Sequence, residues 1–256
     1  DYYNGGMEHA TRHLLYARFW NQFLYNIGLV PNKEPFLKRV SHGMILGENG
    51  EKMSKSKGNV VSPDDLVRDY GCDALRMYEL FVGPPELDAE WDDRGIDGVY
   101  RFLTRVWNLV QDSKDKDIKA TKEMVKIRNK MVCDITSRLE NFSLNTVISG
   151  FMEYNNKLID IAKKEGGVDT ETLSNIAVLL APFAPHMAEE LWEQLGHTGT
   201  VFNAGWPTYD EAAMKDDEIE VAVQINGKTR AVVTVPADVS KDDAIAAGKA
   251  AIADKL

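Results

Sequence analysis

The first third of the chain changes from helical to strand-like patterning of apolar and polar residues. Over residues 7–27 apolar side chains recur at every third or fourth position, which predicts a long amphipathic helix, and Gly28 supplies a C-terminal stop. Residues 39–46 predict a strand, and the Asn49-Gly50 pair after it favours a tight turn. A loop rich in lysine and serine, residues 51–58, leaves that turn.

Two shorter helices are predicted next. Ser62 before Pro63 has the form of a helix start, with a hydroxyl cap and a proline at the first helical position, and Gly71 ends this helix. Asp73 is predicted to cap a second helix, which stops before the Gly-Pro-Pro sequence at residues 83–85. A helical connector is therefore expected.

A helix bundle is predicted after the connector. Helical periodicity covers five segments: residues 96–110, 121–140, 143–164, 169–181 and 185–195. Pro182 and Pro185 lie where one helix must end and the next begin.

The last part of the chain changes period again. Apolar and polar residues alternate over residues 219–225, and the Asn226-Gly227 pair predicts a turn into a second strand at residues 229–235. Ser240 is predicted to open a final helix that runs to Leu256. A small α+β piece is expected there.

Composition limits the class of protein. With 256 residues, 44% of them hydrophobic, the chain can bury a core and form two or three units. Its apolar runs are far shorter than the roughly 20 residues that cross a bilayer, and its first residues lack the pattern of a signal peptide, so a cytoplasmic protein without membrane contact is expected. Cys72 and Cys133 fit neither a metal-ligand spacing nor a disulfide framework, which predicts reduced thiols. The formal net charge of −10 argues against coating of nucleic acid by bulk charge and leaves room for a local basic site.

The lysine-rich loop is the first candidate site. Lys52, Lys55 and Lys57 alternate with Ser54 and Ser56, so three ammonium groups and two hydroxyls can converge on a polyphosphate. Such a group could stabilise charge that develops on a leaving pyrophosphate. A lone run of this kind is more often a solvated basic loop, and only its context favours the phosphate role.

A second candidate site lies upstream. Gly5 and Gly6 stand just before the predicted helix, where free N–H groups and the helix dipole favour an anionic or polyhydroxyl ligand. Glu8 could accept hydrogen bonds from ribose hydroxyls or an amine, or it could only complement the dipole.

Two histidines share one face of the same predicted helix. His9 and His13 have the spacing of a metal pair, but Ala10 stands where a metalloprotease motif has glutamate, and no third ligand is evident. No metal or protein-bound zinc is therefore expected, and a role in a substrate pocket or in packing remains.

Several stretches resemble one family, in the family's order. They are residues 3–10 with 13–19, residues 43–46 leading into Lys-Met-Ser-Lys-Ser at 52–56, residues 70–76, residues 90–91 with 101–107, residues 181–192, and residues 223–230. Together they resemble the class I aminoacyl-tRNA synthetases in their leucyl form, over essentially the whole chain.

The resemblance implies a mainly α chain made of several parts. It implies the C-terminal part of a Rossmann-like catalytic domain with the Lys-Met-Ser-Lys-Ser loop at 1–57, a stem-contact connector at 58–95, an anticodon-binding helix bundle at 96–197, a linker at 198–217, and a partial tRNA-binding α+β domain at 218–256.

The resemblance also implies an activity and its site. The parent enzyme would be a monomeric leucine–tRNA ligase that activates L-leucine with ATP and Mg²⁺ to leucyl-adenylate plus pyrophosphate, then transfers leucine to tRNA(Leu). The implied catalytic residues are Lys52, Ser54, Lys55 and Ser56. The implied ATP-binding residues are Lys52, Met53 and Lys55 at the phosphates, Gly6, Glu8 and His9 at the ribose, and Met44 and Ile45 at adenine. Glu8 and His13 would border the leucine pocket.

Departures from the family leave alternatives open. The family's His-Ile-Gly-His-type ATP motif and its editing domain are not in this sequence, so the chain by itself is expected neither to activate leucine nor to edit. The chain could instead be a stand-alone tRNA-binding module, or part of a valyl- or isoleucyl-type class I synthetase. Candidate residues for tRNA contact, with ordinary solvated charge as the alternative, are Arg94, Arg101, Arg105, Lys228 and Arg230.

Overall fold

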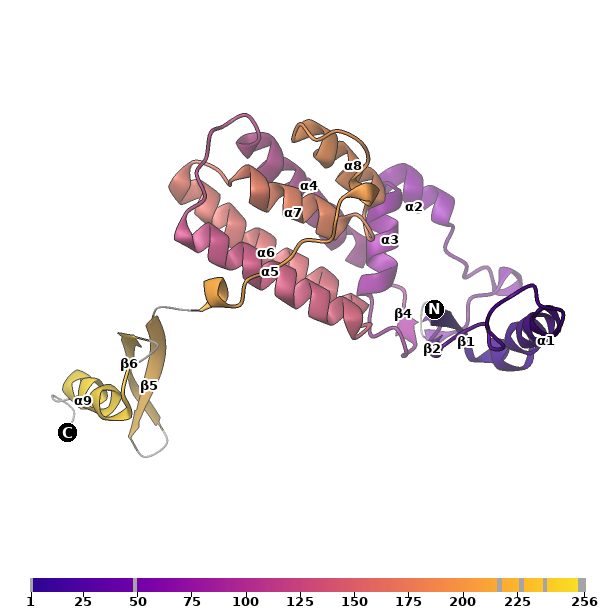
Figure 1. Ribbon diagram of the computed structural model, residues 1–256, viewed down its shortest axis with the longest axis horizontal. Coiled ribbons are helices and arrows are strands. Elements are labelled where there is room, and N and C mark those ends of the chain that lie inside the picture. Colours follow the sequence, from indigo (N-terminus) through magenta and orange to yellow (C-terminus); the bar gives the residue numbers. More distant parts are fainter. Residues whose placement is uncertain (1, 48–49, 216–217, 226–227, 237–238, 253–256) are drawn as a thin grey trace. The chain divides into compact units, whose positions relative to one another are not determined.

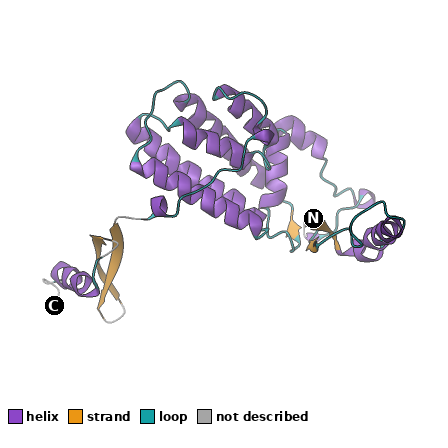
Figure 2. Ribbon diagram, in the orientation of Figure 1, coloured by secondary structure: helices purple, strands orange, loops and turns teal. Residues whose placement is uncertain are grey.

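The chain is mainly helical, as predicted (Figures 1 and 2). The computed structural model describes residues 2–47, 50–215, 218–225, 228–236 and 239–252. Its contacts divide the chain into two units, Asp1–Tyr209 and Asp210–Leu256, which are taken separately below. Within the described ranges no helix is both long enough and apolar enough to cross a membrane.

The first unit begins with a parallel pair of strands joined through a helix. Strand β1 (Tyr2–Gly6) pairs with β2 (Lys38–His42), and the chain between them forms the 3₁₀ helix η1 (Met7–Thr11) and the helix α1 (His13–Asn26). Parallel neighbours need such a crossover, because a tight turn can only join antiparallel strands. This β-α-β arrangement is the repeating unit of a Rossmann-like domain.

The helix predicted over residues 7–27 is in fact two elements. Arg12 has φ −123° and ψ −97°, outside the helical region, and it separates η1 from α1. The predicted stop at Gly28 is confirmed: φ there is +77°, and the N–H of Leu29 donates to the carbonyl of Leu24 at 2.9 Å. Apolar periodicity alone does not detect a break of one residue.

The strand predicted over residues 39–46 is also divided. Strand β2 ends at His42, and β3 (Ile45–Leu46) belongs to a different sheet, in which it pairs in parallel with β4 (Ala89–Glu90). The break lies at Gly43, where a Cβ atom would stand 2.1 Å from the carbonyl oxygen of Leu87. Only glycine permits this approach of two backbones.

The predicted connector contains two helices, α2 (Pro63–Tyr70) and α3 (Cys72–Phe81). Ser62 occupies the N-cap position of α2, but its side chain makes no capping hydrogen bond, contrary to prediction. Helix α3 contributes buried side chains, among them Met77, to the core of the bundle that follows. Cys72 and Cys133 are free thiols.

All five predicted bundle helices are present, each displaced by less than one turn. They are α4 (Gly95–Ser113), α5 (Lys122–Glu140), α6 (Leu144–Glu165), α7 (Thr170–Leu180) and α8 (Pro185–Gln194). Their facing apolar stripes form one core, whose largest fully buried side chains include Ile96, Met124, Met131, Ile135, Ile148, Leu158, Leu173, Leu179 and Leu191.

Asp73 joins the connector to the bundle instead of capping its own helix. It is the second residue of α3, whose N-cap is Gly71, so it does not occupy the predicted cap position. Its carboxylate accepts a hydrogen bond from the backbone N–H of Met187 at 2.8 Å, and it also contacts Nδ1 of His186 at 2.8 Å. The acid therefore satisfies a free N–H in the first turn of α8, more than 100 residues away in sequence.

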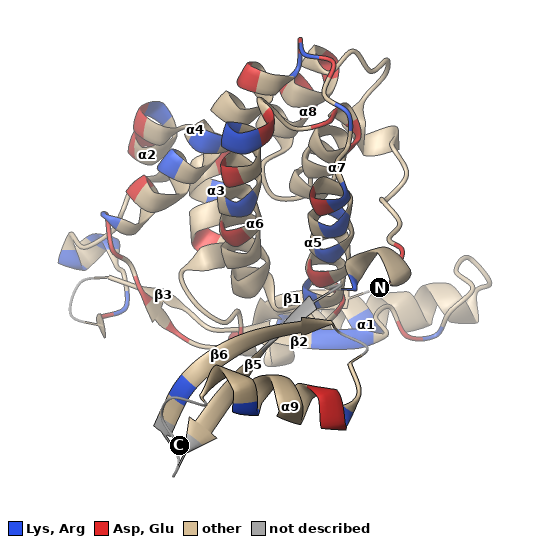
Figure 3. Ribbon diagram, turned by 90° about the vertical axis from the view of Figure 1, so that its left-hand side faces the viewer, with Lys and Arg blue, Asp and Glu red and all other residues tan. Residues whose placement is uncertain are grey.

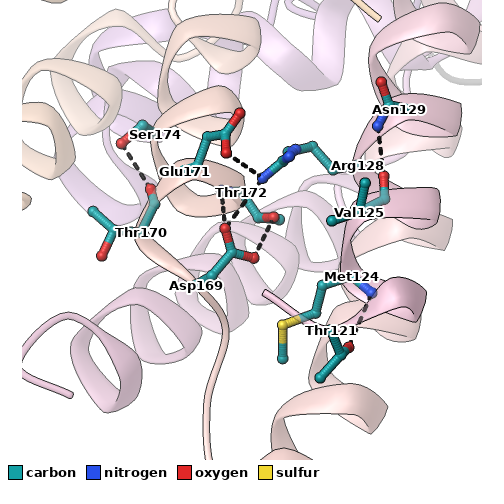
Figure 4. A network of polar contacts seen from close by, with 10 residues as sticks. All are labelled: Thr121, Met124, Val125, Arg128, Asn129, Asp169, Thr170, Glu171, Thr172 and Ser174. Carbon is teal, nitrogen blue, oxygen red and sulfur yellow. Dashed lines mark hydrogen bonds and ion pairs between the residues drawn. The ribbon is translucent and has the colours of Figure 1, made fainter. Parts of the chain in front are cut away.

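A polar network fastens the start of α7 to α5 (Figure 4). Asp169 is the N-cap of α7 and accepts from the backbone N–H of Thr172 at 3.1 Å. The guanidinium of Arg128 on α5 lies 3.2 Å from the Asp169 carboxylate and 2.8 Å from that of Glu171. The Arg128 and Asp169 side chains are only 12% and 6% exposed, so this pair is shielded from water.

The chain after α8 stays on the bundle as far as Tyr209. The short 3₁₀ helix η4 (Val201–Asn203) buries Val201, and the indole of Trp206 donates to the hydroxyl of Thr136 at 2.9 Å. Another 3₁₀ turn, η5 (Ala212–Met214), begins the second unit.

The second unit is the predicted hairpin with one helix. Strands β5 (Glu218–Ile225) and β6 (Lys228–Pro236) are antiparallel, and α9 (Lys241–Ala251) packs on them. Ser240 caps α9 as predicted, accepting from the N–H of Asp243 at 3.2 Å. The predicted turns at residues 48–49 and 226–227, and the end of the chain at 253–256, lie outside the described residues.

Helix α1 carries apolar side chains that this chain does not cover. None of its residues is buried, and Leu15, Phe19 and Phe23 are 67%, 71% and 47% exposed. We expect the substitution Phe19→Glu to change the free energy of unfolding by less than about 0.5 kcal/mol, because it removes no packing. Urea denaturation followed by circular dichroism measures this.

The matched comparison is Leu158→Ala in the bundle core, where the side chain is fully buried. This variant is expected to lose about 2–5 kcal/mol. A comparable loss for Phe19→Glu would show that α1 is packed in solution.

Candidate functional site

The lysine loop, residues 51–58, is a turn of 3₁₀ helix. Helix η3 (Lys55–Lys57) begins after Ser54, and the N–H of Lys57 donates to the Ser54 carbonyl at 3.0 Å. The turn ends at Gly58, whose φ of +68° lies in the left-handed region that glycine adopts at little cost. The chain thereby presents Lys55 on a short helical turn.

Asn59 holds this loop in shape. Its Oδ1 accepts from the backbone N–H of Ser54 at 2.8 Å, and its Nδ2 donates to the carbonyl of Lys52 at 3.4 Å. The hydroxyls of Ser54 and Ser56 are 2.8 Å apart. Asn59 was not predicted from the sequence, because its partners lie five and seven residues earlier, beyond the local reach of an ordinary Asx turn.

The three lysines of the loop have different surroundings. The Lys57 ammonium forms an ion pair with Glu51, with 2.9 Å between nitrogen and oxygen. No ion pair is recorded for the exposed side chains of Lys52 and Lys55 within the described part of the chain. Two of the predicted phosphate ligands are thus exposed cations, and the third is partly neutralised.

Glu8 lies within electrostatic range of the lysine loop. A hydrogen bond from its own backbone lowers the pKa of Glu8, and electrostatic interactions with His9, His42 and Lys52 lower that pKa further. Pairing of β1 with β2 sets His42 opposite Gly6, and a bridge between Leu46 and Lys52 brings the loop back toward β3. The two candidate sites found in the sequence are therefore neighbours.

Gly5 and Gly6 differ from their predicted setting. Both are buried in β1, and they precede the five-residue 3₁₀ helix η1 rather than an α-helix, so the predicted α-helix dipole does not act there. Gly6 has a steric role instead, because a Cβ atom at this position would lie 2.2 Å from Oε2 of Glu8. Its missing side chain makes room for the Glu8 carboxylate.

The two histidines lie among aromatic side chains. Nδ1 of His13 is 3.0 Å from the hydroxyl of Tyr3, and the two rings stack at 5.5 Å between centroids. The His9 ring meets His13 edge-on at 6.4 Å, and its buried Nδ1 has no hydrogen-bond partner. Across the ranges that the structure describes, no group of three or more His, Cys, Asp or Glu side chains could hold a metal ion.

Met44 and Ile45, the predicted adenine contacts, are exposed at the start of β3. The backbone N–H of Met44 donates to Oδ1 of Asp88 at 2.6 Å, and its carbonyl accepts from the N–H of Ala89 at 3.0 Å. These two hydrogen bonds hold β3 against the end of the connector, and the side chains of Met44 and Ile45 remain accessible to a ligand.

The candidate tRNA residues lie on several different elements. Arg94, 90% exposed, is 3.3 Å from the carboxylate of Asp92 and borders a hollow of about 720 Å³ that also reaches Asn59. Arg101 and Arg105 are exposed on α4, and Arg230 is exposed on β6 in the second unit. The side chain of Lys228 lies outside the described residues. Basic and acidic side chains are interspersed on the bundle helices (Figure 3).

Comparisons with known proteins agree with this arrangement. Residues 14–92 match the family "tRNA synthetases class I (I, L, M and V)", and residues 121–245 match the "Anticodon-binding domain of tRNA ligase". A LeuRS from Agrobacterium radiobacter K84, solved in a ternary complex with tRNA and LeuAMS, matches 98% of this chain with 32% identity and a TM-score of 0.81. The match covers 34% of that LeuRS, so the present chain spans about a third of its length.

A more distant structure shares the fold. Methionyl-tRNA synthetase of Mycobacterium tuberculosis, in complex with methionyl-adenylate, matches 77% of this chain and 44% of its own, with 19% identity and a TM-score of 0.55. The parallel strands with their crossover helix, the lysine loop, the helical bundle and the two family matches lead to one conclusion: the chain belongs to the class I aminoacyl-tRNA synthetases.

Proposed function

We propose that this chain is the part of a leucine–tRNA ligase that carries the lysine loop and the tRNA-binding helices. The observation that carries the proposal is the loop itself, in which Lys52 and Lys55 are exposed cations and Lys52 lies within electrostatic range of Glu8. The 32% identity to a LeuRS over nearly the whole chain supports leucine as the amino acid.

The chemistry proposed for the loop is stabilisation of charge on ATP. The leucine carboxylate attacks the α-phosphate, the bond to the bridging oxygen breaks, and pyrophosphate leaves with the electron pair. Negative charge grows on the departing phosphates, and the ammonium groups of Lys55 and Lys52 stabilise it, with hydrogen bonds from Ser54 and Ser56. Mg²⁺ that accompanies ATP supplies further positive charge. The leucyl group then passes to the terminal ribose of tRNA(Leu).

The remaining predicted ligands are assigned to the rest of the adenylate. Gly6, Glu8 and His9 would lie beside the ribose, where the Glu8 carboxylate would accept hydrogen bonds from its hydroxyl groups. Met44 and Ile45 would lie against adenine, and Met53 would support the phosphate side. Glu8 and His13 would border the leucine pocket.

The test of this function is amino-acid-dependent ATP–pyrophosphate exchange. The enzyme measured joins this chain to the remainder of a class I catalytic domain, and leucine, methionine, valine and isoleucine are compared. Leucine is expected to give a kcat/KM at least about 100-fold above each competitor, a ratio that shape differences in apolar pockets can reach. A preference for valine or isoleucine would replace the leucyl assignment with the valyl or isoleucyl alternative.

The chain by itself is expected to give no exchange, since it carries only the lysine-loop side of the ATP site. Detectable leucine-dependent exchange by the purified chain would contradict this division of the site.

A stand-alone tRNA-binding module is the second candidate function. The match of residues 121–245 to an anticodon-binding domain favours it. This candidate would be supported if the chain bound tRNA and if its complete gene encoded no further segment of a catalytic domain.

Asn59 provides a prediction about loop positioning. The variant Asn59→Ala loses both hydrogen bonds that join the two sides of the loop, so the lysines are held less well for the transition state. We expect kcat for exchange to fall about tenfold, with KM for ATP changed less than threefold.

Asn203→Ala is the control, because it removes an exposed asparagine side chain that lies outside the loop. An Asn59→Ala enzyme as active as this control would show that the loop keeps its shape without the bracing side chain.

A further inference from the structure

Phe142, in the turn between α5 and α6, has an unusual backbone conformation for its residue type. Its φ is +57°, in the left-handed region, and among the described residues other than glycine it is the one with a positive φ. A residue with a Cβ atom is strained there, because Cβ approaches the following carbonyl oxygen. Such strain persists where other interactions offset it.

The strain arises at the C-terminal end of α5. The N–H of Phe142 donates to the Leu139 carbonyl at 3.0 Å, and the N–H of Ser143 donates to the Arg138 carbonyl at 2.9 Å. These two hydrogen bonds form a Schellman motif, in which the residue after the C-cap is usually glycine. Phe142 occupies that glycine position.

The same motif ends two other helices of this chain, with glycine at the equivalent position. Gly28 follows α1 with φ +77°, and its N–H donates to the Tyr25 carbonyl at 3.0 Å. Gly196 follows α8 with φ +84°, and its N–H donates to the Glu193 carbonyl at 2.9 Å. The backbone of such a turn does not need phenylalanine, so the reason for Phe142 lies in its ring.

The Phe142 ring contacts the parallel pair of β1 and β2, called the β1–β2 pair below. It stacks on the ring of Tyr2 in β1, with 6.3 Å between centroids and 7° between planes, an arrangement that aromatic rings favour when offset. Lys38 on β2 is the register partner of Tyr2, and its ammonium lies 5.2 Å from the centre of the Tyr2 ring. Among the described residues, the bundle core takes Leu139 and Leu144 from either side of the turn and not Phe142.

The turn that carries Phe142 is braced against α6. Nη1 of Arg138 donates to the Thr146 carbonyl at 2.6 Å, and the hydroxyl of Thr146 donates to the Ser143 carbonyl at 2.8 Å. Gly150 makes room for the guanidinium, since a Cβ atom there would lie 2.5 Å from Nη1 of Arg138. A side chain on a braced turn keeps a fixed position relative to the bundle.

The ring stack is a second point of attachment between the bundle and the β1–β2 pair. The first point runs through the connector, where the N–H of Gly43, just after β2, donates to the Pro85 carbonyl at 2.9 Å. Helix α3 of the connector is fixed on the bundle by Asp73 and by Arg76, whose Nη2 donates to the Pro182 carbonyl at 3.2 Å. One point of attachment leaves rotation about it free, whereas two points fix the angle.

We propose that Phe142 is a positioning residue for the transfer of leucine to tRNA: its ring, stacked on Tyr2, fixes the orientation of the bundle relative to the β1–β2 pair. This inference rests on the proposed function, which supplies a tRNA that extends from the bundle to the adenylate. A displacement of about 1 Å at the reacting atoms slows a reaction strongly, so a small rotation of the bundle slows transfer. Leucine activation is unaffected, because it involves no tRNA and because Tyr2 is about 13 Å along β1 from Gly6.

The test separates the ring from the backbone with two variants of the enzyme that joins this chain to the remainder of a class I catalytic domain. Phe142→Gly removes the ring and relieves the strain, whereas Phe142→Ala removes the ring and keeps a Cβ atom in the left-handed region. Single-turnover transfer of leucine from preformed leucyl-adenylate to tRNA(Leu) is expected to slow about tenfold in both variants. Leucine-dependent ATP–pyrophosphate exchange is expected to stay within about twofold of wild type.

Thermal unfolding of the chain measures the strain independently of activity. Phe142→Gly is expected to unfold about 2–4 °C above Phe142→Ala, so the two variants differ in stability and share one transfer defect. Gly196→Ala calibrates this difference, because a Cβ atom there meets no other atom within 4 Å and only the backbone conformation is strained. If Phe142→Gly unfolds below Phe142→Ala, residue 142 is not strained and the reason given for the ring is wrong.

Conservative and control variants isolate the ring contact. Phe142→Tyr keeps the ring and is expected to transfer leucine at the wild-type rate. Tyr2→Ala is expected to slow transfer about tenfold, and Tyr2→Ala/Phe142→Gly no further, since both substitutions remove the same stack. Phe202→Ala removes a ring that is 59% exposed on η4 and should leave transfer unchanged.

The remaining outcomes separate this inference from the proposed function. If the ring variants transfer leucine at the wild-type rate, Phe142 is not a positioning residue and the proposed function stands. If they lose exchange and transfer by the same factor, the ring supports the β1–β2 pair itself, and the proposed role in orienting the bundle is wrong. If the unaltered enzyme transfers no leucine to tRNA(Leu), the proposed function fails, and this inference fails with it.

Discussion

Replacing Lys55 with alanine is expected to lower kcat for leucine-dependent ATP–pyrophosphate exchange by about 10²–10³-fold, in an enzyme that contains this chain within a complete class I catalytic domain. The reason is that Lys55 is an exposed cation at the start of η3 that forms no ion pair with a described carboxylate, so its charge is available to the departing phosphates. Its effect should fall on kcat much more than on KM for ATP, because the charge it would stabilise develops mainly in the transition state.

Lys57→Ala is the matched control. It removes the same functional group from the same turn, but the Lys57 ammonium is already paired with Glu51 at 2.9 Å. We expect it to lower kcat by no more than about threefold. Lys55→Arg should restore part of the activity lost in Lys55→Ala, since it returns the positive charge. If Lys55→Ala and Lys57→Ala lower kcat by the same factor, Lys55 is not a distinct phosphate ligand.

Removing the Asp169 carboxylate is expected to cost about 3–5 kcal/mol of the free energy of unfolding of the bundle. Two effects act together in Asp169→Ala. The start of α7 loses the cap that accepts from Thr172, and the Arg128 guanidinium, only 12% exposed, loses the buried carboxylate that it contacts (Figure 4). Urea denaturation measures the change as a lower midpoint at an unchanged slope.

Glu171→Gln separates the buried contact from the exposed one. The Glu171 side chain is 69% exposed and also contacts Arg128, so its neutralisation is expected to cost less than about 1 kcal/mol. A double variant, Arg128→Met with Asp169→Ala, should recover part of the stability lost by Asp169→Ala, because it removes a buried guanidinium that would keep only the exposed Glu171 as a partner. If the double variant recovers no stability, the whole loss in Asp169→Ala comes from the missing N-cap of α7.

Much of the helical part of this protein was predictable, because each bundle helix depends on an apolar stripe that its own residues define. The stripes of α4 to α8 are long and bounded by clear signals, such as Pro185 at the start of α8. The hairpin was predictable for the same reason, since alternation over residues 219–225 is a local property. The class of enzyme was predictable because the lysine loop and its flanking motifs lie in order along the chain.

Interruptions of one or two residues were not predictable from periodicity. Arg12 breaks a helix whose apolar pattern continues on both sides. Gly43 ends β2 because the backbone near Leu87, from a distant part of the chain, lies against it. The close approach at Gly43 involves residues that are distant in sequence, and the break at Arg12 does not alter the apolar pattern.

The sequence by itself determined which helices form, where the lysines proposed to bind phosphate stand, and to which family the chain belongs. Only the tertiary structure decided which partners the polar side chains contact. Asp73 accepts a hydrogen bond from α8 instead of capping its own helix, and Glu51 forms an ion pair with Lys57, whereas Lys55 stays exposed. It also set Arg94 beside Gly58 and Asn59, at the end of the lysine loop, and placed Arg105 further along, on α4. The physical reason is that helix formation depends on neighbours three or four residues apart, whereas charge pairing depends on groups that only folding brings together.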